Sequence, residues 1–393
     1  MDQLNDMKHQ PRIVILAEFP AWKVDRTIPS GRSWKYLVWL VSLYETLKMQ
    51  QQYDIHWISF NREISRYRCV ESGGQTFHFF PCGSLTVARV QRFAWDRWRA
   101  RRLLDKLQPQ LVHAWGTESR YAWCGLQYAG KKILSMQGVL RAFHERSPMT
   151  GYYWRLPIRS EKMLMESYDL VTCESIWGCE RCREIAPDVP LVRWEYAANP
   201  LFFDVEREPA EKPYVLMAGT DDPRKNMGVA VEAFRHPALA GVELVGAGLL
   251  AEQHPDLPPN VKALGGVSHE RIAELLSHAW GLVHPSKADT SPNIVKEARV
   301  VGLPVVTTTE CGGMQYIEPG KSGYILAPDD VPGMVKAIGD MTQSRERSLE
   351  MGAFGWEECR RQLSPQTMYE QLMRIYDAVL NNALPEEMLW SDG

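Results

Sequence analysis

This 393-residue sequence lacks a long hydrophobic run, an excess of charge of either sign, and any repeat or low-complexity segment. A membrane-spanning helix needs ~18 uninterrupted apolar residues, and the most apolar early stretch, 34–47, is broken by Lys35, Ser42 and Glu45. This stretch also has the wrong position and flanks for a signal peptide, so we expect a cytoplasmic protein. The 45 Lys and Arg against 48 Asp and Glu, with 45% hydrophobic residues, exclude a disordered or fibrous chain.

Metal-ligating patterns are scarce as well. The eight cysteines are scattered, and Cys179 and Cys182 form a C-x-x-C with Cys173 nearby. A structural zinc site needs a second pair of ligands at matching spacing, and none follows. We therefore predict apolar or helix-surface thiols, and no metal site.

The length and the distribution of charge predict two domains. At roughly 150 residues per domain, the chain holds two or possibly three. Residues 1–200 carry 28 Lys and Arg against 20 Asp and Glu, whereas residues 201–393 carry 17 against 28. Halves of opposite sign suggest different partners. We place the domains at 1–198 and 199–366, with a final segment at 367–393.

Short apolar runs alternate with helix-length amphipathic stretches, which is typical of parallel α/β sheets covered on both faces. One series of strands is expected in the first half, at Arg12–Ala17, Ile55–Phe60, Leu111–Ala114, Lys132–Met136 and Leu170–Cys173. A second series follows at Tyr214–Ala218, Val242–Val245, Val261–Leu264, Gly281–His284, Pro304–Thr308 and Tyr324–Leu326. The sequence therefore predicts two doubly wound domains in tandem. The cleft between them, at the carboxyl ends of the strands, is the expected active site.

A candidate phosphate site lies at 219–228. Gly219 follows an apolar strand, and Arg224 and Lys225 are expected on the first turn of the next helix. Backbone N–H groups, a guanidinium and an ammonium together suit a phosphate. A solvated turn with ordinary surface charges explains the same residues equally well.

Gly246, Gly248 and Ala251 match G-x-G-x-x-A after a strand. This pattern predicts either a dinucleotide site, and hence an oxidoreductase, or a glycine turn that lets a nucleotide or the next helix approach the sheet. The pattern is weak here because it falls in mid-chain.

Asp289 and Glu297 form a third candidate site. Asp289 is expected in a loop after a strand and Glu297 one turn into the following helix. Two carboxylates facing one ligand suit sugar and ribose hydroxyls, which donate hydrogen bonds to them. A capping Asp and a solvated helix Glu are the alternative.

These motifs, in this order, resemble the retaining GT-B glycosyltransferases of family 4. The resemblance rests on Asp289 and Glu297 at their spacing of eight, on Ala298, and on Gly302-Leu-Pro-Val-Val306. It is strong over about 212–330 and fainter before that. It implies a GT-B fold whose C-terminal helix, 367–382, packs back on the first domain.

The resemblance also implies roles for matching positions. Glu297 should bind ribose hydroxyls of a nucleotide diphosphate sugar, and Asp289 should bind hydroxyls of the transferred sugar. Lys225, with Arg224, should hold the diphosphate. The remaining donor-side residues implied are Gly31, Gly219, Gly246, Gly248, Ser291 and Asn293. Transfer would retain the anomeric configuration without a protein nucleophile, and the products would serve polysaccharide or glycoconjugate synthesis.

The acceptor should lie against the first domain, near Gln137 and Gly138. Arg141 is expected to contact it, and His144 or His113 is a candidate base. The acceptor would be a glycan, a lipid-linked glycan or another hydroxyl compound.

Several positions depart from the family pattern. Asp289 stands where the family usually has Glu, and Thr220 stands where it usually has a basic residue. Pro292 stands where the family often has a glycine, and Gln137 where it often has a His. A non-transferring relative, such as a sugar-nucleotide epimerase, or a silent sugar-binding or scaffold subunit therefore stays an alternative. No D-x-D motif is present, so we expect metal-independent transfer and no cofactor.

Segment 87–106 is basic and aromatic, with seven Lys and Arg against Asp96 and Asp105 and with Trp95 and Trp98 among them. Such a helix can lie on an anionic membrane, which would place the protein peripherally on the inner face. A crossover helix with its Trp residues against the sheet and its Arg residues solvated is the alternative. No nucleic-acid-binding module is recognised, so we expect no nucleic acid partner.

Overall fold

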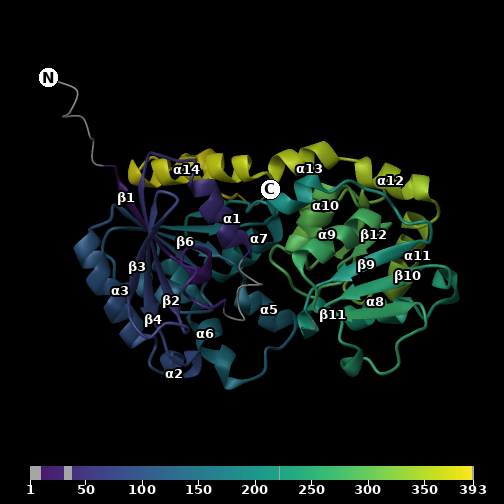
Figure 1. Ribbon diagram of the computed structural model, residues 1–393, viewed down its shortest axis with the longest axis horizontal. Helices are drawn as coiled ribbons and strands as arrows, with labels where there is room; N and C mark the ends of the chain where they lie inside the picture. Colours follow the sequence, from purple (N-terminus) through teal and green to yellow (C-terminus); the bar gives the residue numbers. More distant parts are fainter. Residues whose placement is uncertain (1–9, 31–37, 221, 392–393) are drawn as a thin grey trace.

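The computed structural model describes residues 10–30, 38–220 and 222–391. Two sheets lie side by side, each between layers of helices (Figure 1). This arrangement confirms the expected α/β class with two parallel-sheet domains. The proposed boundaries at 198/199 and 366/367 stay predictions.

The first sheet has eight strands in the order β3-β4-β2-β1-β5-β6-β7-β8. All neighbours are parallel except β3 and β4, which form an antiparallel hairpin at one edge. Val14 and Leu16 of β1 pack into one helix layer, whereas Ile13 and Ile15 pack into the other, so both faces are buried. The strands are β1 (Arg12–Leu16), β2 (Asp54–Asn61), β3 (Arg68–Ser72), β4 (Gln75–Pro81), β5 (Leu111–Trp115), β6 (Lys131–Met136), β7 (Leu170–Cys173) and β8 (Leu191–Arg193).

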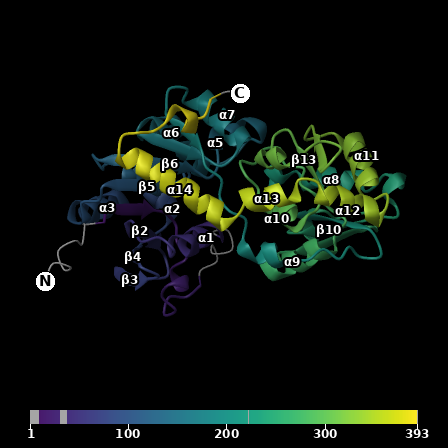
Figure 2. The same ribbon diagram turned by 90° about the horizontal axis from the view of Figure 1, so that it is seen from above.

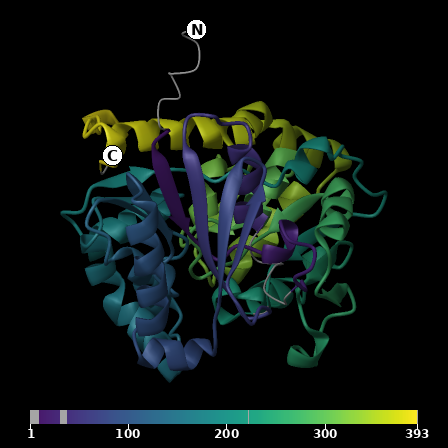
Figure 3. The same ribbon diagram turned by 60° about the vertical axis from the view of Figure 1, so that its left-hand side comes forward.

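Seven α-helices accompany the described part of the first sheet. Figure 3 shows one of them, α3, along a flank of the strands. The helices are α1 (Val38–Leu47), α2 (Leu85–Val90), α3 (Ala94–Leu107), α4 (Tyr121–Gly125), α5 (Leu140–Arg146), α6 (Tyr152–Glu166) and α7 (Ile176–Ile185).

The second sheet has six parallel strands in the order β11-β10-β9-β12-β13-β14. The strands are β9 (Tyr214–Ala218), β10 (Glu243–Ala247), β11 (Val261–Gly265), β12 (Gly281–Val283), β13 (Val305–Thr308) and β14 (Gly323–Leu326). Its helices are α8 (Met227–Ala233), α9 (His269–His278), α10 (Asn293–Val301), α11 (Val331–Met341), α12 (Arg345–Ala353) and α13 (Trp356–Gln362). Every strand expected in this half is present, with small shifts at the ends.

The last helix, α14 (Pro365–Leu380), leaves the second domain and lies across the first (Figure 2). Met368, Leu372 and Tyr376 are buried in the same core as Ile13 and Ile15 of β1. The expectation that the C-terminal helix packs back on the first domain is therefore confirmed.

The prediction of a single helix over 87–106 is wrong. The chain forms α2 and α3 instead, because Arg92 and Phe93 adopt the left-handed conformation with φ of 48° and 56°. Such φ values end a run of helical hydrogen bonds. The hairpin of β3 and β4 and the short β8 were not among the expected strands.

Candidate active site at the interface of the two domains

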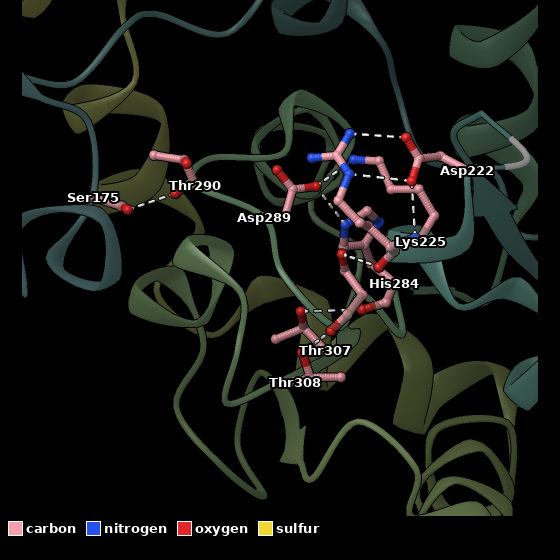
Figure 4. A network of polar contacts seen from close by, with 10 residues as sticks. Ser175, Asp222, Lys225, His284, Asp289, Thr290, Thr307 and Thr308 are labelled. Carbon is pink, nitrogen blue, oxygen red and sulfur yellow. Dashed lines mark hydrogen bonds and ion pairs between the residues drawn. The ribbon is translucent and has the colours of Figure 1, made fainter. Parts of the chain in front are cut away.

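The loops after β9 and β12 meet at a lysine–aspartate contact (Figure 4). Lys225 Nζ donates to Asp289 Oδ2, and His284 Nε2 lies 3.1 Å from the same oxygen. Burial alone would raise the pKa of Asp289, but the Lys225 charge and the His284 hydrogen bond outweigh it and hold that pKa below its usual value. Asp289 is therefore an ionised carboxylate beside an ammonium. The two parallel strands β9 and β12 are neighbours in the sheet, which explains how residues 64 positions apart come together.

Arg224 lies on the same loop but has a different partner. Its guanidinium Nη2 donates to Asp222 at 2.9 Å, and its Cζ lies 4.6 Å from the centre of the Phe143 ring, which belongs to α5 of the first domain. The expectation that Arg224 and Lys225 occupy the first turn of a helix is wrong. They form a short 3-10 turn, Pro223–Lys225, and α8 begins after Asn226, which is left-handed.

Glu297 lies on α10 and is 6% exposed. Its carboxylate has no hydrogen-bond partner among residues 10–30, 38–220 and 222–391. Burial raises its pKa to about 7, and the neighbouring Lys296 charge offsets this only in part. An acid in such surroundings accepts a hydrogen bond from a ligand readily, because none of its lone pairs is engaged by another described residue.

Ser291 and Asn293 flank Pro292 at the start of α10, and both are half-buried. Pro292 is the N-cap residue and makes no side-chain capping bond. The donor-binding roles of Ser291 and Asn293 stay predictions.

The glycines after β9 and β10 pack against each other. Gly248 has φ of +94°, and a Cβ there would lie 1.8 Å from the carbonyl oxygen of Gly219. Gly246 is within β10. The G-x-G-x-x-A pattern leads into a three-residue 3-10 turn, Ala251–Gln253, and so lacks the α-helix N-terminus of a dinucleotide site. Gly31, the remaining donor-side glycine, lies outside the described residues.

The first domain contributes the loop after β6 and helix α5. Gln137 and Gly138 lie in this loop, and the next residue, Val139, donates its N–H to Thr290 Oγ1 at 3.3 Å. At the other end of α5, the Arg146 guanidinium donates to the Glu310 carboxylate. The end of the loop thus contacts the residue that directly follows Asp289, and α5 contacts Glu310, whose carbonyl accepts the Asp289 N–H at 3.1 Å.

Two further acceptor-side candidates are on α5. His144 is exposed, and its Nδ1 accepts the backbone N–H of Met149 at 3.0 Å. Arg141 is half-buried, and its backbone N–H donates to Glu161 at 2.9 Å. Their contacts with an acceptor stay predictions.

The prediction of His113 as an acceptor-side base is wrong. His113 is fully buried in β5, with Nδ1 2.9 Å from Tyr376 Oη and Nε2 2.7 Å from Ser135 Oγ. Burial lowers its pKa to about 3, so the ring is neutral. It links the first sheet to α14 and does not reach the domain interface.

Sequence reasoning missed several residues that assemble this interface. Ser175 Oγ donates to the Thr290 carbonyl at 2.5 Å, and Lys296 Nζ donates to Glu174 at 2.7 Å. His284 directly follows β12, at the end of the strand that the sequence predicts over Gly281–His284, and that position was the available signal. The Glu174–Lys296 pair carries no sequence signal, because its members lie 122 residues apart.

Two properties of the described ranges concern metals and membranes. No group of three or more His, Cys, Asp or Glu side chains there is arranged to hold a metal ion. No helix within those ranges is long and apolar enough to cross a membrane.

Residues 199–356 match the family model described as "Glycosyl transferases group 1". The chain is 30% identical over 82 residues to Spore coat protein SA of Bacillus subtilis, covering 21% of this chain and 22% of that protein. It is 27% identical over 154 residues to Sulfoquinovosyl transferase SQD2 of Arabidopsis thaliana, covering 38% and 30%. These alignments therefore span less than a third of either relative.

Solved structures share the fold over nearly the whole chain. A sucrose-phosphate synthase from Thermosynechococcus elongatus superposes with a TM-score of 0.73 at 16% identity, covering 95% of this chain and 100% of that one. Anabaena HepE in complex with UDP-glucose gives a TM-score of 0.66 at 14% identity, covering 94% and 100%. Residues 199–356 are therefore similar to the group 1 glycosyl transferases, and the two domains of the chain have the GT-B fold.

Proposed function

We propose that this protein transfers a sugar from a nucleotide diphosphate sugar to a hydroxyl group of a glycan or lipid-linked glycan, with retention of the anomeric configuration. The observation that carries the proposal is the contact of Lys225 with Asp289 at the ends of two adjacent strands. An ammonium and a carboxylate side by side match the two parts of such a donor, its anionic diphosphate and its hydroxyl-rich sugar.

In this proposal the bound donor takes the place of side-chain contacts within the protein. Lys225 turns from Asp289 to the diphosphate, and Asp289 then accepts hydrogen bonds from sugar hydroxyls. Arg224 can exchange Asp222 for a phosphate oxygen. Both cations would stabilise the negative charge that develops on the leaving diphosphate.

Glu297 would accept hydrogen bonds from the ribose hydroxyls, since its carboxylate has no hydrogen-bond partner among the described residues. Retention would follow if the leaving phosphate oxygen takes the acceptor proton on the same face, so that no protein nucleophile is needed. Gln137, Gly138, Arg141 and His144 stay the proposed acceptor side. The group 1 family match and the UDP-glucose bound by HepE support this reading.

Glu297→Ala tests the donor site. We expect a folded variant to bind nucleotide diphosphate sugars about 10- to 100-fold more weakly, since a hydrogen bond to a charged group contributes about 1.5–3 kcal/mol. A thermal-shift screen finds the nucleotide that binds, and calorimetry then gives the affinities. Glu370→Ala removes the same charge from the exposed side of α14 and is the matched control. Equal affinity of the folded Glu297→Ala variant and the wild type would refute the assignment.

Lys225→Met tests the diphosphate contact. The wild type should bind the nucleoside diphosphate more tightly than the nucleoside, and Lys225→Met should lose most of that difference while its affinity for the nucleoside stays the same. Turnover should continue in the presence of a chelator, because cationic side chains supply the neutralisation. A variant that keeps the full preference for the diphosphate would exclude Lys225 from this role.

A further inference from the structure

An exposed aromatic and basic surface lies on the first domain, on α2, the exposed side of α3 and the start of α6. Six large hydrophobic side chains on these helices are solvent-exposed, namely Val87, Val90, Trp95, Trp98, Tyr152 and Tyr153. Trp95 is 63% exposed and Trp98 49% exposed. Indole rings of this size are seldom left in water without a partner, and a cluster of them indicates an interaction surface.

The two tryptophans do not face the sheet, which refutes the alternative of a crossover helix with buried Trp residues. They lie three positions apart on α3, with ring centres 5.9 Å apart and planes at 85°. Arg102, one turn further on, lies over the Trp98 ring at 4.9 Å. Because α3 has 3.6 residues per turn, these three side chains share one face.

The basic residues of 87–106 divide into two groups. Three of them are engaged with the protein, since Arg89 lies over Tyr153 at 3.3 Å, Arg97 lies over Trp123 at 5.8 Å, and Arg99 donates to the Pro81 carbonyl at 2.6 Å. Arg92, Arg101, Arg102 and Lys106 are exposed.

The acidic residues of the segment do not cancel these exposed charges. Asp96 is buried and paired with Arg120 at 3.0 Å, and Asp105 pairs with Arg101 at 2.7 Å. Arg92, Arg102 and Lys106 therefore have no carboxylate partner in the described chain. Exposed aromatics beside uncompensated cations match the interface of a bilayer with anionic headgroups, where indole rings lie at headgroup depth.

The helices of this surface form one continuous support. α2 contacts both α3 and α6, and the Arg89–Tyr153 contact ties α2 to the start of α6. Figure 1 places α3 on the side of the first sheet that faces away from the second sheet. A flat partner can therefore cover α3 without touching the second domain.

We propose that the surface formed by α2, α3 and the start of α6 binds the protein to the surface of an anionic lipid bilayer. Trp95 and Trp98 enter the headgroup region, and Arg92, Arg102 and Lys106 contact lipid phosphates. The proposal does not rest on the enzymatic activity, because its measured quantity is binding to vesicles.

Flotation with vesicles tests the proposal. The full chain should bind vesicles of phosphatidylcholine mixed with phosphatidylglycerol, bind vesicles of phosphatidylcholine alone at least tenfold more weakly, and dissociate as salt screens the headgroups. Replacing Arg92, Arg102 and Lys106 together by Gln should weaken binding about a hundredfold, since each cation near such a surface contributes about fivefold. Trp95→Ala/Trp98→Ala should also lose binding.

Two controls make the outcome decisive. Phe354→Ala removes an exposed aromatic of the second domain, which is 40% exposed, and should bind vesicles like the wild type. Far-ultraviolet circular dichroism shows whether each variant is folded. Nucleotide binding, measured separately, distinguishes failure of this proposal from failure of the proposed transfer activity. Failure of the wild type to bind anionic vesicles, or unchanged binding by both sets of variants, would overturn the proposal. So would a dimer in light scattering that the Trp95→Ala/Trp98→Ala variant abolishes, because a second copy would then cover the surface.

Discussion

Glu297 is buried and Asp289 is half-buried, and their surroundings shift their pKa values in opposite directions. Asp289 faces Lys225 and His284, which keep it ionised. Glu297 faces no hydrogen-bond partner in the described chain, and burial raises its pKa to about 7. The carboxylate of Asp289 is hydrogen-bonded within the protein, whereas that of Glu297 has no such partner among the described residues and is the one that we propose to bind a ligand.

Glu297→Gln should therefore stabilise the protein at alkaline pH. The folded-state pKa of Glu297, about 7, exceeds the usual value of 4.5, so its contribution to the free energy of unfolding falls as the pH rises between these values. Gln does not ionise, and the gain over wild type should grow from pH 5 to pH 8, to at most about 3 kcal/mol. Chemical denaturation at the two pH values measures it. Glu370→Gln is the control, and a gain independent of pH would contradict the raised pKa.

The motifs singled out Asp289, Glu297 and Lys225 but did not predict that Lys225 pairs with Asp289. The family resemblance implied that all three bind the donor, which stays a prediction, and the structure brings two of them into contact. The sequence did not show that His113 is buried rather than at the surface, because no local sequence pattern marks a polar residue inside a buried strand. Its partners, Tyr376 and Ser135, lie 263 and 22 residues away.

At the scale of elements, the turn after β10 depends on Gly248. Its φ is +94°, and a Cβ added there would approach the Gly219 carbonyl oxygen to 1.8 Å, which leaves no room for a side chain. Gly248→Ala should cost about 3 kcal/mol or more, since strain and overpacking each contribute about 1–3 kcal/mol. Gly228→Ala is the matched control, because Gly228 lies on α8 with nothing within 4 Å of its Cβ position and should be neutral or slightly stabilising.

Thermal denaturation measures both glycine variants. A Gly248→Ala melting temperature equal to that of Gly228→Ala would show that the turn relaxes at no cost.

Strands were easier to predict than the course of the helices. Buried parallel strands are continuous apolar runs, so β1, β5 and β7 are visible in the sequence. The break between α2 and α3 was not, because Arg92 and Phe93 are not residues that usually mark a left-handed turn. The sequence is amphipathic on both sides of the break, so it predicted one continuous helix.

At the scale of the whole molecule, a buried ion pair joins the two domains. Lys296 is fully buried on α10, and its ammonium donates to Glu174 at 2.7 Å and to the Tyr196 carbonyl at 3.2 Å. Burial raises the pKa of Glu174 to about 7, although the Lys296 charge opposes the shift. Glu174 is therefore fully charged only on the alkaline side of neutrality.

Lys296→Met should destabilise the protein by about 3–5 kcal/mol at pH 8, because the buried Glu174 must then either stay charged without its partner or bind a proton. The loss should be smaller at pH 5, where Glu174 can protonate, and Lys296→Met/Glu174→Gln should recover most of it. Denaturant titration at both pH values measures the effect. Lys262→Met breaks an exposed pair with Glu243 and should cost less than about 1 kcal/mol. A loss that the second substitution does not recover would point to packing rather than charge.

The contacts of Thr290 have a consequence for the exchange of domains between relatives. Its carbonyl and hydroxyl are held by Ser175 and by the Val139 N–H, both from the first domain, and the preceding residue is Asp289. A chimaera that joins this second domain to a foreign first domain would thus inherit the residues that we propose to bind the donor, but not the groups that hold their loop. Transplanting donor preference between such proteins would require Ser175 and the loop after β6 to be carried over with it.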